Sequence, residues 1–375
     1  MKSKTGATDK LKNFEFTIFF TVIGLFLLGI VLLMSATHLN DLKRIIIQFA
    51  TFLIGFGFLA ATSLFDYMRI KKYHRYIYGL CIFLLLLVWI PGIRRPQFGA
   101  YSWVSMFGVF NLQTSEIVKP LFILLYAAYL EDKKGRISEM GDLVKALLFP
   151  VPILLLIFIQ PDLGGTIVFL CIMFGMLFVA GLDIKLILLG FTSFILSFPL
   201  IYKFALKPHQ VKRLNDYVNI LLNPSDLSTL YTENLQVIQS ITAIGSGGVF
   251  GKGWMKGTYS QYGFIPVASS DFLFSVAGEE FGFIGMSIIL LLFFIFLIRI
   301  LRIAVLSKDF YGTLICIGSF SMFFYQVVQN IGMTIGIIPV TGLTLPFVSY
   351  GGSSMISAMM TVSLVLNVSK NRKQF

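Results

Sequence analysis

The amino-acid sequence predicts an all-α, polytopic membrane protein with about ten transmembrane helices. Of its 375 residues, 57% are hydrophobic and 13% are charged, and the mean hydropathy is +0.84. Soluble domains carry roughly twice that share of charged residues. Apolar runs of about 20 residues, the length that crosses a bilayer as a helix, recur along the chain. We therefore treat residues 1–375 as a single transmembrane domain.

Each predicted helix is one of these apolar runs. The first follows a basic tail, 1–15, and is longer than the core of a cleavable signal peptide, so we expect a retained helix. In chain order, the ten predicted spans lie at 16–36, 45–64, 76–92, 114–130, 144–160, 164–182, 185–203, 272–298, 310–335 and 344–368.

Lysine and arginine residues indicate the orientation of these helices. They gather in the N-terminal tail and at 69–75, 133–136, 299–308 and 370–373. Ten crossings with both termini in the cytoplasm place all of these segments on the inner side. The net charge of +12 is then explained by anionic membrane lipids and requires no nucleic acid.

Polar and turn-forming residues gather on the opposite, outward side. The predicted extracytoplasmic loop at 204–270, between the seventh and eighth helices, is too long for a simple connection. Within this loop 234–241 has helical spacing, with Gln239 and Ser240 on its polar side. We therefore expect any chemistry to face outward, where four irregular stretches fall: 93–113, 160–164, 204–270 and 336–352.

Asp271 opens the eighth span and is the candidate catalytic residue. The structural alternative is a helix N-cap, although Ser269 and Ser270 could cap the helix equally well. Glu279 and Glu280 follow within the span, where ionisable groups are costly and usually functional. On an ideal helix Glu279 lies within about 80° of Asp271 and Glu280 about 180° away. We predict that Glu279 lines the same cavity and that Glu280 makes a structural contact.

Three more polar sites lie at the outward ends of predicted helices. Asp162 sits in a tight turn, where a turn-forming role is the simpler interpretation. Glu116 and Lys119 are three residues apart and can pair on one helix face. The segment 349–354 is small, hydroxylated and rich in glycine. Lipid offers its backbone no partner, so the segment must be buried in protein or line a wet cavity.

Basic residues also occur in the outward stretches, and a solvated rim is the simpler interpretation of most of them. An acid in a cavity ringed by cations is nonetheless what sugar transfer from a diphosphate requires. The cations neutralise the leaving pyrophosphate, and the carboxylate accepts the proton of the attacking hydroxyl. Arg213 and Lys119 are the cations that we assign to this task. A divalent cation, Mg²⁺ or Mn²⁺, is left open, and no other cofactor is predicted.

Several motifs, in this order, resemble the SEDS family (shape, elongation, division and sporulation). The resemblance runs from about residue 100 to 360. Gly251-Lys252-Gly253-Trp254 is more similar to its RodA-like elongation branch than to its FtsW-like division branch. The family motifs are Gln160-Pro161-Asp162-Leu163-Gly164, Ile244-Gly245-Ser246-Gly247-Gly248, Gly278-Glu279-Glu280-Phe281-Gly282 after Asp271, and Leu345-Pro346-Phe347-Val348-Ser349-Tyr350-Gly351-Gly352-Ser353-Ser354.

The resemblance implies a ten-helix peptidoglycan glycosyltransferase that polymerises lipid II outside the cytoplasmic membrane. It also implies a class B penicillin-binding protein as the transpeptidase partner. Asp271 matches the family's catalytic position. Its other functional positions match Asp162, Glu116, Lys119, and Ser349 and Ser353 of the serine-rich segment. To these substrate-binding candidates the residue-based analysis adds Arg213, Gln239, Ser240 and Glu279.

Three positions depart from the family pattern, and none of them touches Asp271. Thr114 stands where the family usually has proline, Ser102 where it often has arginine, and Val267 where it often has glutamate. The last two departures put in doubt any role of these positions in holding substrate.

Two other function classes remain open at this point. A flippase for a lipid-linked precursor would need polar residues through the cytoplasmic halves of the spans, which are mostly apolar. A scaffold that only recruits a synthase would need no acid within the membrane, whereas this chain has several at 271–280.

Overall fold

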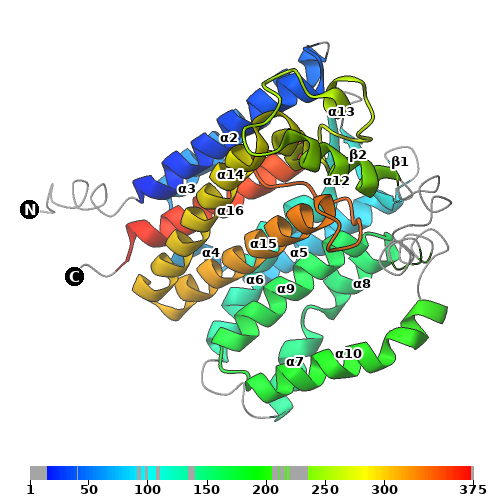
Figure 1. Ribbon diagram of the computed structural model, residues 1–375. Helices are drawn as coiled ribbons and strands as arrows, with labels where there is room; N and C mark the ends of the chain where they lie inside the picture. The colour runs from blue at the N-terminus through cyan, green and yellow to red at the C-terminus, as the bar shows by residue number, and fades with distance from the viewer. Residues whose placement is uncertain are drawn as a thin grey trace, which may run out of the picture.

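The computed structural model describes residues 15–39, 41–90, 94–97, 100–106, 110–133, 140–204, 211, 215, 218 and 235–372. These residues form a helical bundle with a small sheet at one end (Figure 1). The helices are α2 (Phe16–Ala36), α3 (Leu42–Leu64), α4 (Tyr67–Lys71), α5 (His74–Leu86), η1 (Leu87–Trp89), α6 (Thr114–Asp132), α7 (Met140–Leu148), α8 (Val151–Ile159), α9 (Leu163–Val179), α10 (Ile184–Phe204), α12 (Leu235–Gly247), α13 (Thr258–Gln261), α14 (Leu273–Leu306), α15 (Phe310–Thr334) and α16 (Gly352–Lys370).

Several of these helices have the length and composition of membrane spans. Within the described residues six qualify: Phe16–Ala36, Leu42–Thr62, Met140–Ile159, Leu273–Leu306, Phe310–Thr334 and Gly352–Lys370. His74–Trp89 and Leu163–Val179 are apolar but shorter. The helical membrane class is therefore confirmed, while the total of ten crossings stays a prediction.

A three-stranded antiparallel sheet corrects the all-α prediction. Its strands are β1 (Arg94–Gln97), β2 (Ala100–Met106) and β3 (Phe110–Gln113), in the order β1-β2-β3. The register pairs Arg95 with Trp103, and Trp103 with Gln113. Aromatic and β-branched residues favour strands, but these strands are too short to stand out beside long apolar helices. The sheet leads directly into α6 and so determines where that helix begins.

Two predicted helix boundaries are wrong, and one predicted span is interrupted. The span predicted at 144–160 corresponds to Met140–Ile159, which is divided into α7 and α8 because Pro150 cannot donate the next helical hydrogen bond. The span predicted to end at 298 continues to Leu306. The last helix begins at Gly352 rather than at 344. Pro346 lacks an N–H group, and Phe347 has a φ of 64°, which is incompatible with a right-handed helix.

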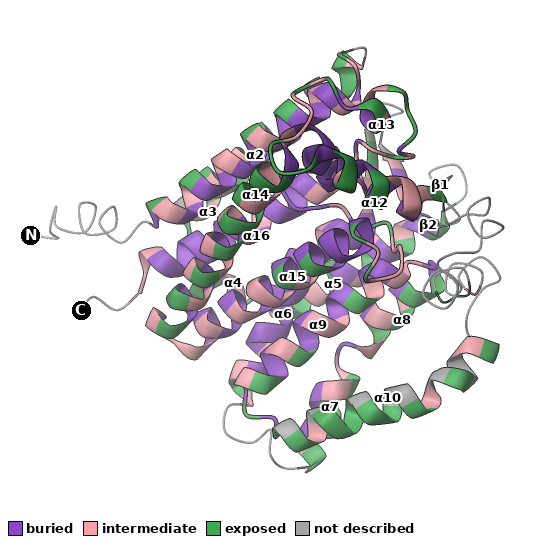
Figure 2. Ribbon diagram, viewed as in Figure 1, coloured by how far each residue is buried: buried purple, intermediate pink, exposed green. Residues whose placement is uncertain are grey.

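The last helix, α16, occupies the centre of the bundle. It contacts α3, α6, α14 and α15, and its first turns also contact β3. Figure 2 shows buried residues along α16 and exposed residues on the outer faces of α2 and α14. Small residues permit such close packing between membrane helices. For example, a side chain at Gly55 of α3 would overlap Met359 of α16.

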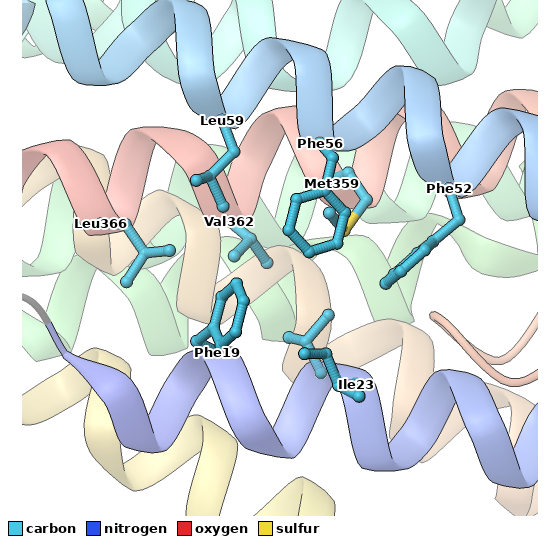
Figure 3. Close-up of a pocket in the computed structure, with 9 residues that line it drawn as sticks. Phe19, Ile23, Phe52, Phe56, Leu59, Met359, Val362 and Leu366 are labelled. Carbon is cyan, nitrogen blue, oxygen red and sulfur yellow. The ribbon is translucent and has the colours of Figure 1, made fainter.

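A small apolar pocket lies between α2, α3 and α16 (Figure 3). Phe19 and Ile23 enter it from α2, Phe52 from α3, and Met359 from α16. Every residue that lines the pocket is apolar. We therefore assign the pocket to helix packing rather than to chemistry.

The two ends of the described chain meet at one end of the bundle. Glu15, which precedes α2, pairs with Arg372 after α16 at 2.6 Å and with Arg299 of α14 at 3.1 Å. The sheet, α12 and α13 lie at the opposite end (Figure 1). That opposite end also carries most of the predicted site residues.

Candidate active site

Asp271 lies in the turn that precedes α14. The N-cap of α14 is Phe272, one residue later, and the backbone N–H of Asp271 donates to the Val267 carbonyl at 3.2 Å. A side chain at Gly342 would lie 3.6 Å from the Asp271 carboxylate. Gly342 has a φ of 75°, a conformation that glycine adopts without strain. This glycine therefore allows the linker between α15 and α16 to run beside the carboxylate.

The turn before α14 is held from two other helices. Arg44 of α3 donates through Nη1 to the Ser269 hydroxyl at 2.8 Å, and its guanidinium lies over the Tyr350 ring. The backbone N–H of Tyr350 donates to the Ser269 carbonyl at 3.0 Å. On the opposite side, Asn330 of α15 donates to the Asp271 carbonyl at 2.9 Å. These contacts hold Asp271 in a defined position.

Asp162 forms the second acidic position and is the N-cap of α9. One carboxylate oxygen accepts the Gly165 N–H at 2.8 Å, and the other accepts from Ser115 Oγ at 3.0 Å and from Gln113 Nε2 at 3.3 Å. The turn-forming interpretation is thus part of its role. A side chain at Gly164 would meet Leu343 and the Thr341 carbonyl at 3.1 Å. The segment 341–343 therefore lies between the Asp162 turn and Asp271.

The serine-rich segment joins the same region. Ser353, in the first turn of α16, accepts the backbone N–H of Gln113 at 2.9 Å. Ser349 accepts the Leu345 N–H at 3.1 Å, and its own carbonyl accepts from Gln48 Nε2 at 3.0 Å. Protein groups thus bond the backbone of the serine-rich segment at these positions, in agreement with the prediction that lipid could not supply its partners. Through these bonds Ser353 contacts the end of β3, and Ser349 stabilises the turn before α16.

Glu116 and Lys119 form a buried ion pair in the first turns of α6, 2.5 Å apart. Lys119 is fully buried, and Glu116 Oε2 is buried with no hydrogen-bond partner among the described residues. Burying two charges costs several kcal/mol per ion before their attraction is counted. Such a pair stabilises a fold poorly, which favours a functional role for it near Ser115 and Asp162.

Glu279 was expected beside Asp271, but the structure places it elsewhere. Its fully buried carboxylate accepts from the backbone N–H groups of Tyr259 and Ser260, both at 2.8 Å, and from Lys252 Nζ at 2.8 Å. The prediction assumed that only helix rotation decides what a side chain meets. The loop at 252–261 instead folds back onto α14 and takes up both oxygens. Glu280 makes the structural contact that was expected, with Ser35, Ser260 and Gln261.

The remaining predicted residues divide into two groups. Ser240 of α12 is fully buried and bonds Ser275 Oγ at 2.5 Å and the Thr334 carbonyl at 2.6 Å, so it joins three helices. Gln239 is half-buried, and its Oε1 has no partner among the described residues. Arg213 lies outside the described residues, and so does most of 204–234.

Sequence reasoning missed Asn330, Arg44 and Gln48. Asn330 and Gln48 are polar residues within apolar spans, which is a signal that they face the bundle interior. Residue type alone could not reveal their partners, because these lie in loops distant in the sequence. Among the described residues no three His, Cys, Asp or Glu side chains come together. A divalent cation would therefore need ligands from substrate phosphates, as Mg²⁺ commonly does.

A protein family described as "Cell cycle protein", named for FtsW, RodA and SpoVE, matches residues 14–374. The chain belongs to this family. Stage V sporulation protein E of Bacillus subtilis is 37% identical to it over 313 residues, covering 81% of both chains. Peptidoglycan glycosyltransferase MrdB of Escherichia coli is 35% identical over 298 residues, covering 80% of this chain and 78% of that protein. A probable peptidoglycan glycosyltransferase FtsW of Geobacter sulfurreducens is 32% identical, covering 97% of each chain.

Solved structures of family members share the fold. A chain of a peptidoglycan synthase complex that coordinates polymerization and crosslinking matches with a TM-score of 0.80 at 32% identity, covering 96% of this chain and 99% of that one. The rod shape determining protein RodA of Thermus thermophilus matches with a TM-score of 0.70 at 28% identity, covering 96% and 98%. Sporulation, FtsW and RodA relatives all match, so the RodA-like branch stays a prediction.

Proposed function

We propose that the chain is a peptidoglycan glycosyltransferase that joins lipid II disaccharides into glycan strands at the outer face of the bacterial inner membrane. The observation that carries this proposal is the convergence of Asp271, the 341–343 segment and the Asp162 turn. They come from three distant parts of the sequence. Relatives named peptidoglycan glycosyltransferase, both RodA and FtsW, support the same activity.

In this mechanism Asp271 is the general base. Its carboxylate accepts the proton of the acceptor sugar's 4-hydroxyl as that oxygen attacks the anomeric carbon of the lipid-linked donor. The bond between the anomeric carbon and the diphosphate oxygen breaks, and the lipid diphosphate leaves with both electrons. A positioned base contributes about 10²–10⁴-fold to the rate. The tethers at Ser269 and Asp271 support this role, because they hold the base still.

Cations are needed where the diphosphate departs. Lys119 is fully buried and paired with Glu116, so we assign it a field effect on the site rather than direct contact with phosphate. Contact with the diphosphate falls to Arg213, in the long loop after α10. Glu116 offsets most of the Lys119 charge, so the field effect of Lys119 is that of a fixed dipole in low-dielectric surroundings. Asp162 and Ser353, which both bond Gln113, lie beside the first turn of α6, the helix that carries Lys119.

A class B penicillin-binding protein is the partner that we propose. A related chain has been solved in a peptidoglycan synthase complex, and exposed apolar side chains on α14, such as Phe283 and Phe294, offer a surface within the membrane. Co-purification from membranes at native expression tests this, and full activity of the isolated chain would argue against a required activator.

Replacing Asp271 with asparagine tests the catalytic proposal. Asparagine keeps the size of the side chain but is not a base, so Asp271→Asn should lose polymerisation of lipid II in proteoliposomes by about 10²-fold or more. Membrane accumulation should be unchanged. Asp66→Asn is the matched control, because Asp66 is an exposed N-cap outside the site and asparagine caps equally well.

The outcomes separate the competing functions. Near wild-type glycan synthesis by Asp271→Asn would refute the assignment of the base. Failure of the variant to accumulate would instead assign Asp271 a structural role. Movement of labelled lipid II across the bilayer without any glycan product would favour the flippase alternative.

A further inference from the structure

Asn330 is a buried polar residue of α15 that joins two segments of the site. Its side-chain nitrogen donates to the Asp271 carbonyl at 2.9 Å and to the Leu343 carbonyl at 2.7 Å. The side chain is fully buried. Carbonyl oxygens only accept hydrogen bonds, so the nitrogen of the amide must be the atom that lies between them.

One carbonyl belongs to the candidate base itself, and the other belongs to the segment that runs beside its carboxylate. Leu343 follows Gly342, the residue beside the Asp271 carboxylate, and its side chain lies against Gly164 near the Asp162 turn. The Asn330 amide therefore determines the distance between the Asp271 backbone and the segment at 342–343, which runs beside the Asp271 carboxylate.

We propose that Asn330 is a positioning residue for the transfer reaction, acting through Asp271. The inference rests on the proposed function of Asp271 as the base. The other end of the same turn is held independently, through Ser269 by Arg44 and Tyr350. Loss of Asn330 should therefore free the Asp271 end of the turn while the rest of it stays in place.

Measurement of kcat and KM separately, per folded molecule, tests this role. Asn330→Ala should lower kcat for lipid II polymerisation by about 10- to 100-fold, the effect of displacing a reacting group by about 1 Å. KM should stay within about threefold, because no group that contacts substrate is removed. Asn330→Ser retains one donor and should give an intermediate kcat, and it provides the measurement if the alanine variant does not accumulate.

Gln329→Ala is the matched control. Gln329 is the neighbouring residue, also buried, and its side-chain nitrogen donates to the Pro339 carbonyl at 3.0 Å in the same linker. If holding the linker were all that mattered, Gln329→Ala and Asn330→Ala would lower kcat equally. That result would overturn the proposal. We expect Gln329→Ala to retain kcat within about threefold.

A double variant shows whether Asn330 acts through Asp271. When the base is absent, its position no longer matters, so adding Asn330→Ala to Asp271→Asn should not lower the residual rate further. Effects that multiply in the double variant would overturn the inference. If Asp271→Asn alone keeps the wild-type rate, the proposed function itself fails. If Asp271→Asn is inactive while both Asn330 variants keep wild-type kcat, only the positioning role fails.

Discussion

Glu279 and Glu280 are adjacent in the sequence, yet their carboxylates hold different parts of one loop. Glu279 binds the backbone of Tyr259 and Ser260, and Glu280 binds the side chains of Ser260 and Gln261. Each hydrogen bond to a buried carboxylate replaces one that water would have made, and hydrogen bonds to charged groups are among the stronger ones. The pair thus fastens the loop at 252–261 to the outer end of α14.

Glu279→Gln tests this fastening. The amide would keep one acceptor oxygen and replace the other with an NH2 group, so the backbone N–H of either Tyr259 or Ser260 would face a donor and lose its acceptor. We expect the free energy of unfolding to fall by about 2–3 kcal/mol. Limited proteolysis should also become faster at 252–261, measured by mass spectrometry on detergent-purified protein.

The control for Glu279→Gln is Asp132→Asn. Asp132 also pairs with a lysine, Lys71, but its side chain is 56% exposed, and exposed ion pairs contribute only about 0–1 kcal/mol. Equal destabilisation by the two changes, or unchanged cleavage at 252–261 in Glu279→Gln, would contradict the anchoring role.

The site was predictable from the sequence wherever chemistry is local. The pairing of Glu116 with Lys119 follows from a spacing of three on one helix, and the structure contains it. The turn at Asp162 follows from its proline and glycine neighbours. Asn330 was missed and Glu279 misplaced because their partners lie in loops about 13–60 residues away in sequence. No periodicity in the sequence records such contacts.

At the scale of secondary structure, α14 is interrupted where a loop replaces its hydrogen bonds. Gly282 has φ 64° and ψ −160° inside this helix. The N–H groups of Phe283 and Ile284 donate to the carbonyls of Gly248 and Val249 at 2.9 and 3.2 Å. A break in a membrane helix is tolerated where protein satisfies the freed groups. The loop at 248–253 does so here.

Gly282→Ala should therefore be strongly destabilising. Only glycine adopts this backbone conformation readily, and a Cβ would lie 2.6 Å from the Val249 carbonyl oxygen. We expect a loss of about 2–3 kcal/mol, seen as a lower unfolding temperature in detergent. Gly79→Ala in α5 is the control, since no atom lies within 4 Å of a Cβ there and alanine favours helices. A tolerated Gly282→Ala would mean that the break is not required.

Some secondary-structure elements were predictable from the local sequence, and others were not. Long apolar runs predicted α2, α3 and α15 within a few residues, because burial in lipid demands length and hydrophobicity. The start of α16 could not be predicted from hydropathy, since 344–351 is apolar enough to continue the helix. The short strands β1 to β3 depend on one another for stability, and single-strand patterns of four to seven residues do not reveal that.

For the whole molecule, the ion pairs of Glu15 bring the first and last helices to one end of the bundle, opposite the candidate site. An even number of crossings accounts for this arrangement. The basic segments at 69–75 and 299–308 then fall on the side of the termini, which favours a cytoplasmic location for that side. This supports the proposed outward location of Asp271.

Cysteine labelling in intact cells tests this orientation. A cysteine introduced at Asp226, in the predicted outer loop and outside the described residues, should react with a membrane-impermeant maleimide before lysis. A cysteine at Asp66, after α3, should react only after lysis, once native Cys81, Cys171 and Cys316 are replaced. The reverse pattern would invert the proposed sidedness and place the site in the cytoplasm.

The central position of α16 has a consequence for how the protein is made. In its most apolar stretch 83% of the residues of α16 are buried, against 22% in α14, yet α16 is made after the other helices that the structure describes. Its Asn367 also donates to the carbonyls of Thr62 and Phe65 and accepts from the Tyr67 N–H, closing the corner after α3. The helices made earlier are therefore already inserted in the bilayer while the surfaces that will contact α16 still lack that partner. A ribosome that stalls before residue 352 produces a chain that lacks α16, the helix around which the other described helices pack. We expect quality-control proteases of the membrane to remove this chain.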